Sequence, residues 1–128
     1  MELCNNALFW QKIDTLFFSS EVVIERPKKT THPLYANMVY PVDYGYLKDT
    51  GAVDNAGVDV FVGSEKSHSI EHIIVAADIL KKDIEIKILY GCNEEEIAKI
   101  LSFMNQTDFQ KTILIKKGSE IPHWAESK

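Results

Sequence analysis

The chain has 128 residues, a formal net charge of −5, and hydrophobic and charged fractions of 45% and 26%. This length and composition predict a single globular domain, residues 1–128, with a core of ordinary size. The acidic balance argues against nucleic-acid binding, which needs a basic surface, but it leaves phosphate ligands open because metal ions can supply positive charge. The apolar runs are too short to span a bilayer, so no membrane partner is expected.

The first residues lack a basic region followed by an apolar core. This absence of a secretory pattern predicts a cytoplasmic location. Cys4 and Cys92 lie far apart in the sequence and match no metal-binding spacing. We therefore expect two free thiols rather than a disulfide.

In the first half of the chain, the pattern predicts a helix followed by strands. Apolar residues at helical spacing predict a helix over 7–17, whose aromatic stripe is a core or self-association surface. A strand is predicted over 21–25 and ends before Pro27, which cannot donate to a sheet. Residues 26–39 are polar and proline-punctuated, which indicates a loop whose basic residues either contact phosphate or are simply solvated. Another strand is predicted over 58–63.

The second half predicts more strands and one capped helix. A near-continuous apolar run within 70–80 is typical of a strand buried on both faces. Isoleucine at every second position over 84–88 predicts a strand with one buried side. Asn93 and Glu96 are placed to form a capping box at the start of a helix with an apolar stripe, and a last strand is predicted over 112–116. These elements fit an α+β, mainly β, fold, and composition alone does not choose among such folds.

Residues 40–62 carry most of the functional information, because three tyrosines and four aspartates surround two short apolar runs. The end of this stretch is a polar turn that leads into a strand from which Asp59 projects on the side opposite Val58 and Val60. Asp54 precedes it across a glycine-containing turn. Two converging carboxylates suit Mg²⁺, although Asp and Asn before Gly57 are also ordinary turn residues.

Three sequence elements support a resemblance to a known family. They are Tyr-Pro-Val-Asp-Tyr-Gly-Tyr at 40–46, the aspartates at 54 and 59, and the upstream strand at 22–27 that ends Glu-Arg-Pro. Their order and spacing resemble the signature region of the family I (soluble) inorganic pyrophosphatases over about residues 20–90. The resemblance implies an OB-like five-stranded β-barrel with flanking N-terminal and C-terminal helices. It also implies Mg²⁺-dependent hydrolysis of pyrophosphate or a related small phosphoanhydride, with Mn²⁺ as a substitute.

The resemblance further implies roles for particular acidic, basic and tyrosine side chains. The catalytic residues it implies are Glu25, Tyr44 and Lys87. The phosphate-binding residues it implies are Lys28, Lys29, Tyr44 and Lys87. The metal ligands it implies are Asp54, Asp59 and Asp83, and Asp43 is a further candidate because it replaces the asparagine of the family. Each has a structural alternative: the tyrosines as core aromatics, and Glu85 with Lys87 as an exposed pair on a strand.

The chain also departs from the family pattern. Ala56 stands where the family has the aspartate that helps activate the attacking water, and Ile86 stands where it has another aspartate. Residues 105–111 lack a clear counterpart of the family's Tyr-Lys pair, and one hairpin is shortened between 33 and 38. Two functions therefore stay open. The first is a Mg²⁺-dependent phosphohydrolase with weakened turnover at most where Ala56 and Ile86 replace acids. The second is a non-catalytic relative that binds phosphate, a nucleotide-like ligand or a protein partner. Homo-oligomerisation is a further expectation.

Overall fold

The computed structural model describes residues 4–51 and 56–118. The helices are α1 (Ala7–Phe18) and α2 (Glu94–Met104). The strands are β1 (Val22–Arg26), β2 (Asp43–Leu47), β3 (Val58–Val62), β4 (His72–Asp78), β5 (Asp83–Tyr90) and β6 (Gln110–Lys116). Within these described ranges, neither helix is long and apolar enough to cross a membrane.

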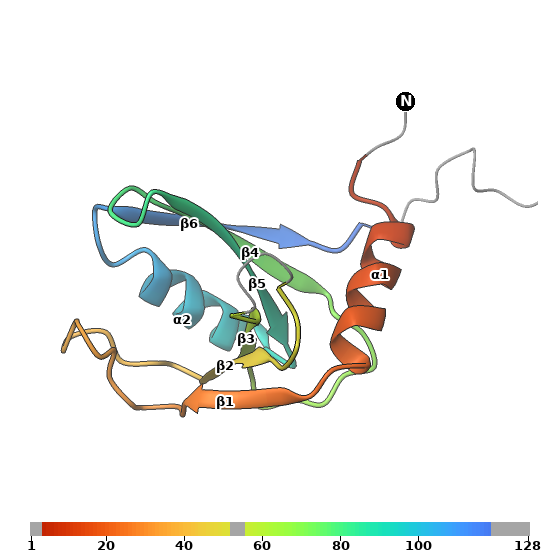
Figure 1. Cartoon of the computed structure of the whole chain (residues 1–128), viewed down its shortest axis with the longest axis horizontal. Helices are drawn as coiled ribbons and strands as arrows, with labels where there is room; N and C mark the ends of the chain where they lie inside the picture. The colour runs from red at the N-terminus through yellow and green to blue at the C-terminus, as the bar shows by residue number, and fades with distance from the viewer. Residues whose placement is uncertain (1–3, 52–55, 119–128) are drawn as a thin grey trace, which may run out of the picture.

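The strands form one six-stranded mixed sheet in the order β1-β2-β3-β5-β4-β6. Only β3 and β5 pair in parallel; the other neighbours are antiparallel. The expected five-stranded closed barrel is wrong, because β1 and β6 are the two edges of an open sheet and lie on opposite sides of the molecule (Figure 1). The additional strand is β2, whose Tyr-Gly-Tyr sequence lacks an apolar alternation that would predict it.

Glycine at position 45 explains how β2 can pair closely with β1. A Cβ at this position would lie 1.9 Å from the carbonyl oxygen of Val23, so only glycine lets the two backbones approach this closely. The pairing is antiparallel and changes register between Ile24 and Arg26, which leaves Glu25 at a β-bulge. The site residue Tyr44 is thereby fixed on a strand rather than on a loop.

Each face of the sheet is covered by one helix. Trp10 and Phe17 of α1 pack with Val60, Ile73 and Ile88 on one face. The other face packs against α2, and its core includes Phe61, Ile74, Leu89, Ile97, Ile100 and Phe103. The alternation predicted for β3 is confirmed, since adjacent Val60 and Phe61 are both fully buried in opposite clusters.

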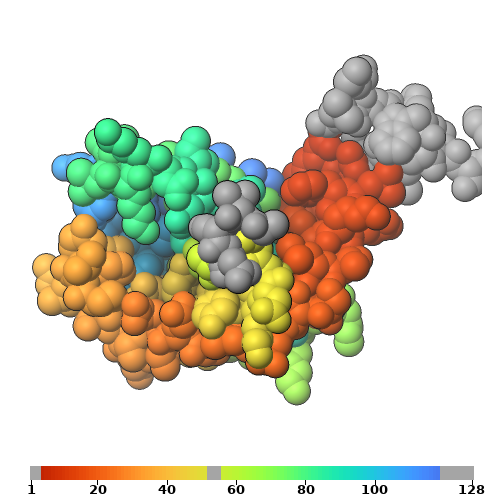
Figure 2. All heavy atoms as spheres, in the orientation of Figure 1, coloured from red at the N-terminus to blue at the C-terminus, as the bar shows by residue number. Residues whose placement is uncertain are grey.

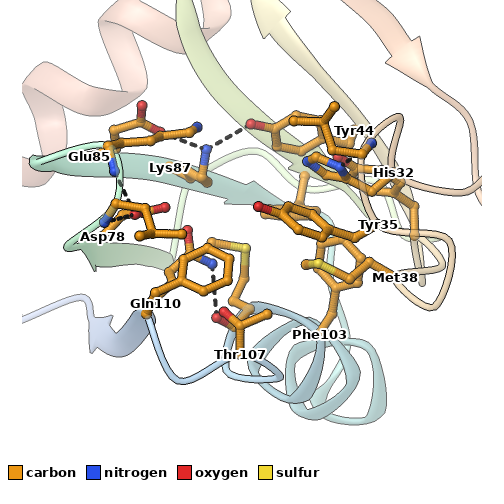
Figure 3. Close-up of a pocket in the computed structure, with 17 residues that line it drawn as sticks. His32, Tyr35, Met38, Tyr44, Asp78, Glu85, Lys87, Phe103, Thr107 and Gln110 are labelled. Carbon is orange, nitrogen blue, oxygen red and sulfur yellow. Dashed lines mark hydrogen bonds and ion pairs between the residues drawn. The ribbon is translucent and has the colours of Figure 1, made fainter.

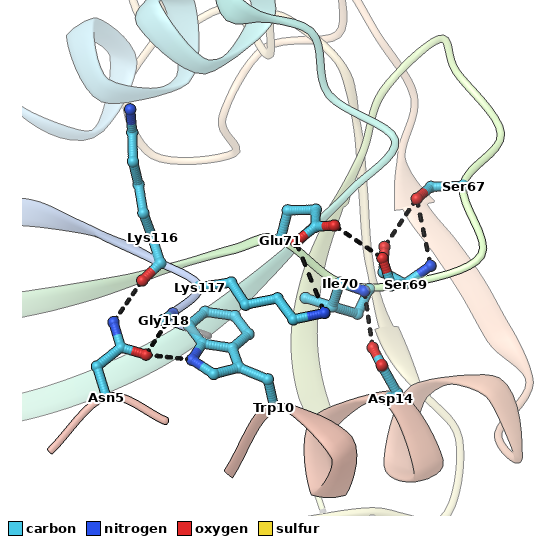
Figure 4. Close-up of polar contacts among 10 residues, drawn as sticks. All are labelled: Asn5, Trp10, Asp14, Ser67, Ser69, Ile70, Glu71, Lys116, Lys117 and Gly118. Atoms are coloured by element: carbon cyan, nitrogen blue, oxygen red, sulfur yellow. Dashed lines mark hydrogen bonds and ion pairs between the residues drawn. The ribbon is translucent and has the colours of Figure 1, made fainter. Parts of the chain in front are cut away.

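The N-terminal segment is tied to the end of β6 through polar contacts beside α1 (Figure 4). The Asn5 side chain bonds Trp10 Nε1 and the backbone of Lys116 and Gly118. One turn further along α1, Asp14 Oδ1 accepts a hydrogen bond from the Ile70 N–H at 2.7 Å. These bonds orient α1 so that Trp10 is completely buried.

The buried side predicted for the start of β5 is wrong. Ile84 and Ile86, expected on a buried side, are 71% and 54% exposed, whereas Lys87 is only 6% exposed. The prediction is wrong there because α1 covers this face of the sheet only from about Ile88 onward. The capping box of α2 is confirmed: Asn93 Oδ1 accepts from the Glu96 N–H at 2.8 Å, and Glu96 Oε1 accepts from the Asn93 N–H at 2.9 Å.

Candidate functional site

A buried lysine is the polar centre of the face that α2 covers. Lys87 Nζ donates hydrogen bonds to Tyr44 Oη at 2.7 Å, Asp59 Oδ2 at 2.7 Å and Glu85 Oε2 at 3.1 Å. The Lys87 side chain is 8% exposed, against 28% for Asp59 and 35% for Glu85. We call Tyr44, Asp59, Glu85 and Lys87 the lysine cluster. It holds an ammonium group beneath two partly exposed carboxylates.

Strand pairing brings these residues together from distant parts of the sequence. Asp59 on β3 lies directly opposite Lys87 on β5 in the parallel pair. Glu85 precedes Lys87 by two residues and therefore shares its face of the sheet. Tyr44 on β2 is paired with Phe61 of β3, which lies two residues after Asp59 and on the same face of the sheet. The centre of the Tyr44 ring lies 5.1 Å from Lys87 Nζ.

The electrostatics of the cluster favour a charged lysine and a neutral tyrosine. Burial alone would lower the pKa of Lys87, but Tyr44 and Asp59 outweigh it and hold that pKa above its ordinary value. Burial raises the pKa of Tyr44 well above its ordinary value, so its hydroxyl stays protonated. Burial opposes ionisation of Glu85, but the Lys87 ammonium prevails and lowers its pKa. One ammonium against two carboxylates leaves one formal negative charge.

Lys87, Glu85 and Tyr44 also line one side of a cavity of about 340 Å³, with Lys87 between the other two (Figure 3). The cavity lies between the sheet, the β1–β2 loop, the β4–β5 turn and the end of α2 with the connection to β6. Its other walls are largely aromatic. The tyrosine and phenylalanine residues that line it are Tyr35, Tyr40, Tyr44, Phe61, Phe103 and Phe109.

Positive charge also lies near the cavity. Lys81 is one of the lining residues. Burial lowers the pKa of His32, and the charges of Arg26 and Lys81 lower it further. Burial raises the pKa of Tyr40 even though the neighbouring Arg26 guanidinium opposes that shift. The Lys81 charge also acts on Glu85, so it would favour an anion inside the cavity.

The structure brings three of the predicted site residues together and places others elsewhere. Tyr44, Asp59 and Lys87 belong to the lysine cluster, and Asp54 lies outside the described residues. Glu25 is exposed at the bulge of β1.

The remaining predicted residues make no hydrogen bond to Lys87 in the part of the chain that the structure describes. Lys28 and Lys29 are exposed on the β1–β2 loop. Asp43 accepts a hydrogen bond from the Lys28 N–H at 2.8 Å and lines a different surface hollow, beside Phe17. Asp83 is exposed, its carboxylate accepts from the N–H of the next residue, and its side chain interacts with that of Glu85. Their predicted roles in phosphate or metal binding stay predictions.

Sequence reasoning did not assign a site role to Glu85 and did not predict the aromatic cavity. The alternating isoleucines around Glu85 and Lys87 did indicate that these two side chains share a face. What the sequence could not give is the pairing of β5 with β3, which adds Asp59 and buries Lys87. The cavity walls come from distant parts of the sequence: Phe61 follows Tyr35 by 26 residues, and Phe103 follows it by 68. No local sequence pattern therefore indicates the cavity.

The donor set can be compared with what Mg²⁺ requires. In the described ranges 4–51 and 56–118, no group of three or more His, Cys, Asp or Glu residues is placed to hold a metal ion. Asp59 and Glu85 do converge, since both carboxylates bond the same Lys87 nitrogen. Mg²⁺ commonly binds through one or two carboxylates together with water and substrate phosphates. Asp59 and Glu85 therefore offer two carboxylates, both already paired with Lys87, to an ion whose other ligands would be water and substrate.

Comparison with solved structures identifies the fold. The chain superposes on the inorganic pyrophosphatase of the pathogenic bacterium Helicobacter pylori with a TM-score of 0.51 and 16% identity, covering 74% of this chain and 81% of that one. The chain has an inorganic pyrophosphatase fold. A structure described as an inorganic phosphatase from Anaplasma phagocytophilum matches with a TM-score of 0.49, 16% identity and the same coverage. No family model and no curated protein sequence matches the chain. At 16% identity, the similarity to the pyrophosphatase structure shows a shared fold and nothing about activity.

Proposed function

We propose that this pyrophosphatase-fold chain binds a small phosphoanhydride, such as pyrophosphate, together with Mg²⁺ at the lysine cluster and hydrolyses it slowly to phosphate. The observation that carries the proposal is the convergence of Asp59 and Glu85 on Lys87, which lines a cavity together with Glu85. The fold resembles that of a pyrophosphatase, and the cluster retains three residues to which the sequence resemblance assigns site roles.

Asp59 and Glu85 would hold the metal, with Mn²⁺ as a substitute for Mg²⁺. The bound ion would neutralise charge on the phosphates and lower the pKa of a water molecule. Lys87 and the protonated Tyr44 hydroxyl would donate hydrogen bonds to phosphate oxygens. All three hydrogen bonds of the Lys87 ammonium go to protein acceptors, so it must release one of them to bind phosphate. Because the cluster is formally negative, anion binding should require the metal.

A second candidate is a protein that binds the phosphate ligand without turning it over. It is favoured by Ala56, which stands where the family resemblance places a water-activating aspartate, and which offers no acid or base. Loss of a general base typically costs about 10²–10⁴-fold in rate. The two candidates share the ligand and differ in the chemical step.

Phosphate release from pyrophosphate, with Mg²⁺, Mn²⁺ or EDTA, tests the proposal. Release should depend on the metal and be lost in Asp59→Asn and Glu85→Gln. Asp83→Asn tests the alternative metal ligand, since the side chain of Asp83 interacts with Glu85. Glu94→Gln is the matched control, because Glu94 is an exposed carboxylate in the first turn of α2. If Asp83→Asn abolishes release and Glu85→Gln does not, the metal lies where the sequence resemblance put it rather than where we propose.

Calorimetry with methylene diphosphonate, a non-hydrolysable analogue, separates the two candidates. Metal-dependent binding without phosphate release would support the binding protein. Absence of both binding and release would reject both candidates. Cytoplasmic location and self-association stay predictions, the latter favoured by Phe9 and Phe18 of α1, which are 49% and 47% exposed.

A further inference from the structure

The cavity beside the lysine cluster has walls that do not suit bare pyrophosphate. Pyrophosphate presents charged oxygens on every side, and burying such groups against carbon is costly. The surface next to Tyr44 is built from aromatic rings and methionines. The polar residues that line the rest of the cavity are His32, Asp78, Lys81, Glu85, Lys87, Thr107 and Gln110. A ligand that fills this space must therefore carry an apolar or aromatic part as well as phosphate.

The rings form a continuous wall that leads away from the cluster. Tyr44 stacks on Tyr40 with ring centres 5.3 Å apart and an interplanar angle of 27°. The ring centres of Tyr40 and Phe103 are 4.7 Å apart, and those of Tyr44 and Phe61 are also 4.7 Å apart. Met38 and Met104 add polarizable side chains to the same lining. Such a wall suits a planar ring system, which can stack on aromatic faces.

The mouth of the cavity exposes apolar groups to water. Leu34 and Leu80 are 79% and 65% exposed, and Tyr35 is 37% exposed, although all three line the cavity. Tyr35 is held at the mouth by contacts with His32 at 5.0 Å and Phe109 at 5.7 Å. The organic part of a ligand would cover these side chains, and the volume of about 340 Å³ lies within the range of about 300–1,000 Å³ common for small-molecule sites.

The charged groups set the direction in which such a ligand would lie. Lys87 lines the cavity beside Glu85 (Figure 3), and Lys81 lines it from the β4–β5 turn, where its charge acts on Glu85 as well. Asp78, also in the lining, is already engaged, because its carboxylate accepts from the backbone N–H groups of Leu80 and Lys81, both at 2.9 Å. Phosphates would therefore lie toward Lys81 and Lys87, and the planar group toward Tyr35, Tyr40 and Phe103.

We propose that the cavity binds the planar aromatic group of an organic phosphate of the nucleoside diphosphate class. The ring system stacks on the aromatic wall while the phosphates reach the lysine cluster. The phosphate end of this inference rests on the proposed function. The aromatic end rests independently on the composition of the cavity walls and its exposed mouth.

Calorimetric binding of ADP, pyrophosphate and methylene diphosphonate, each with Mg²⁺, tests this inference. ADP should bind about ten-fold or more tightly than pyrophosphate, which is the gain expected from one base stacked on aromatic side chains. Tyr35→Ala should lower ADP affinity about ten-fold and leave pyrophosphate affinity unchanged. Phe9→Ala is the matched control, because Phe9 is 49% exposed on α1, against the opposite face of the sheet.

The results distinguish this inference from the proposed function. Equal affinity for ADP and pyrophosphate, or an unchanged ADP affinity in Tyr35→Ala, would overturn the nucleotide site. Metal-dependent hydrolysis of pyrophosphate without ADP binding would overturn it and leave the hydrolase intact. ADP binding that depends on Tyr35, without hydrolysis of either compound, would support the site and reject the hydrolase. Binding of none of the three probes would reject both.

Discussion

Replacing Lys87 with methionine tests whether the lysine cluster is formed and how much it stabilises the fold. The change removes the ammonium and keeps a long unbranched side chain, so the space stays largely filled. Removing one partner of a buried ion pair typically costs about 3–5 kcal/mol. The carboxylates of Asp59 and Glu85 are 28% and 35% exposed and can regain some water, so we expect a loss of about 2–3 kcal/mol in the free energy of unfolding.

Urea unfolding followed by circular dichroism measures this change. With an m-value of about 1–3 kcal/mol per molar, the midpoint should fall by about 1 M or more. Lys99→Met is the control, since the Lys99–Glu95 pair at 3.0 Å is 59% and 76% exposed and should contribute little to stability. A loss in Lys87→Met no larger than in the control would refute the reasoning.

Four further outcomes are expected. Asn93→Ala removes the capping box of α2 and should lower the unfolding free energy by about 1 kcal/mol in urea titrations. Gly45→Ala places a Cβ 1.9 Å from a β1 carbonyl oxygen, and circular dichroism should show loss of the native fold. Burial raises the pKa of Cys92 to about 12, so mass spectrometry after alkylation at pH 8 should find label on exposed Cys4 only. Burial and two nearby cations lower the pKa of His32, so the folded state binds fewer protons than the unfolded state and stability should fall with pH below about 6.5. His32→Gln should flatten that dependence in urea titrations.

Local sequence rules predicted the elements whose physics is itself local. The capping box at Asn93 was predictable because its two partners lie three residues apart. The alternation of β3 was also predictable, although nothing local showed that Phe61 would be as buried as Val60. The strand β2 was missed because Gly45 has low strand propensity, and the reason it belongs in a strand is its contact with β1.

The site was less predictable than the fold because it depends on pairing between distant strands. The family resemblance indicated Tyr44, Asp59 and Lys87, and these three residues do meet. The resemblance gave no role to Glu85. A charged residue that alternates with isoleucines along a strand is also typical of a solvent-exposed face. In the structure Ile84 and Ile86 are exposed and Lys87 is buried, the opposite of what the alternation predicted. The reason is that a helix covers only part of each face of the sheet, and the sequence does not show which part.

The position of the site follows from which strands α2 covers. The core that α2 shares includes Ile74 and Ala76 of β4, which pair with Lys87 and Glu85, but from β5 it includes only Leu89 among the described residues. Glu85 and Lys87 therefore lie on the neighbouring strand, beside the covered part of this face. The β1–β2 loop and the β4–β5 turn close the remainder incompletely, which leaves the cavity. A charged lysine that is largely buried beside such a space needs an ionic partner. Its partners here are carboxylates that water still reaches, so an incoming ion or phosphate can replace one of them.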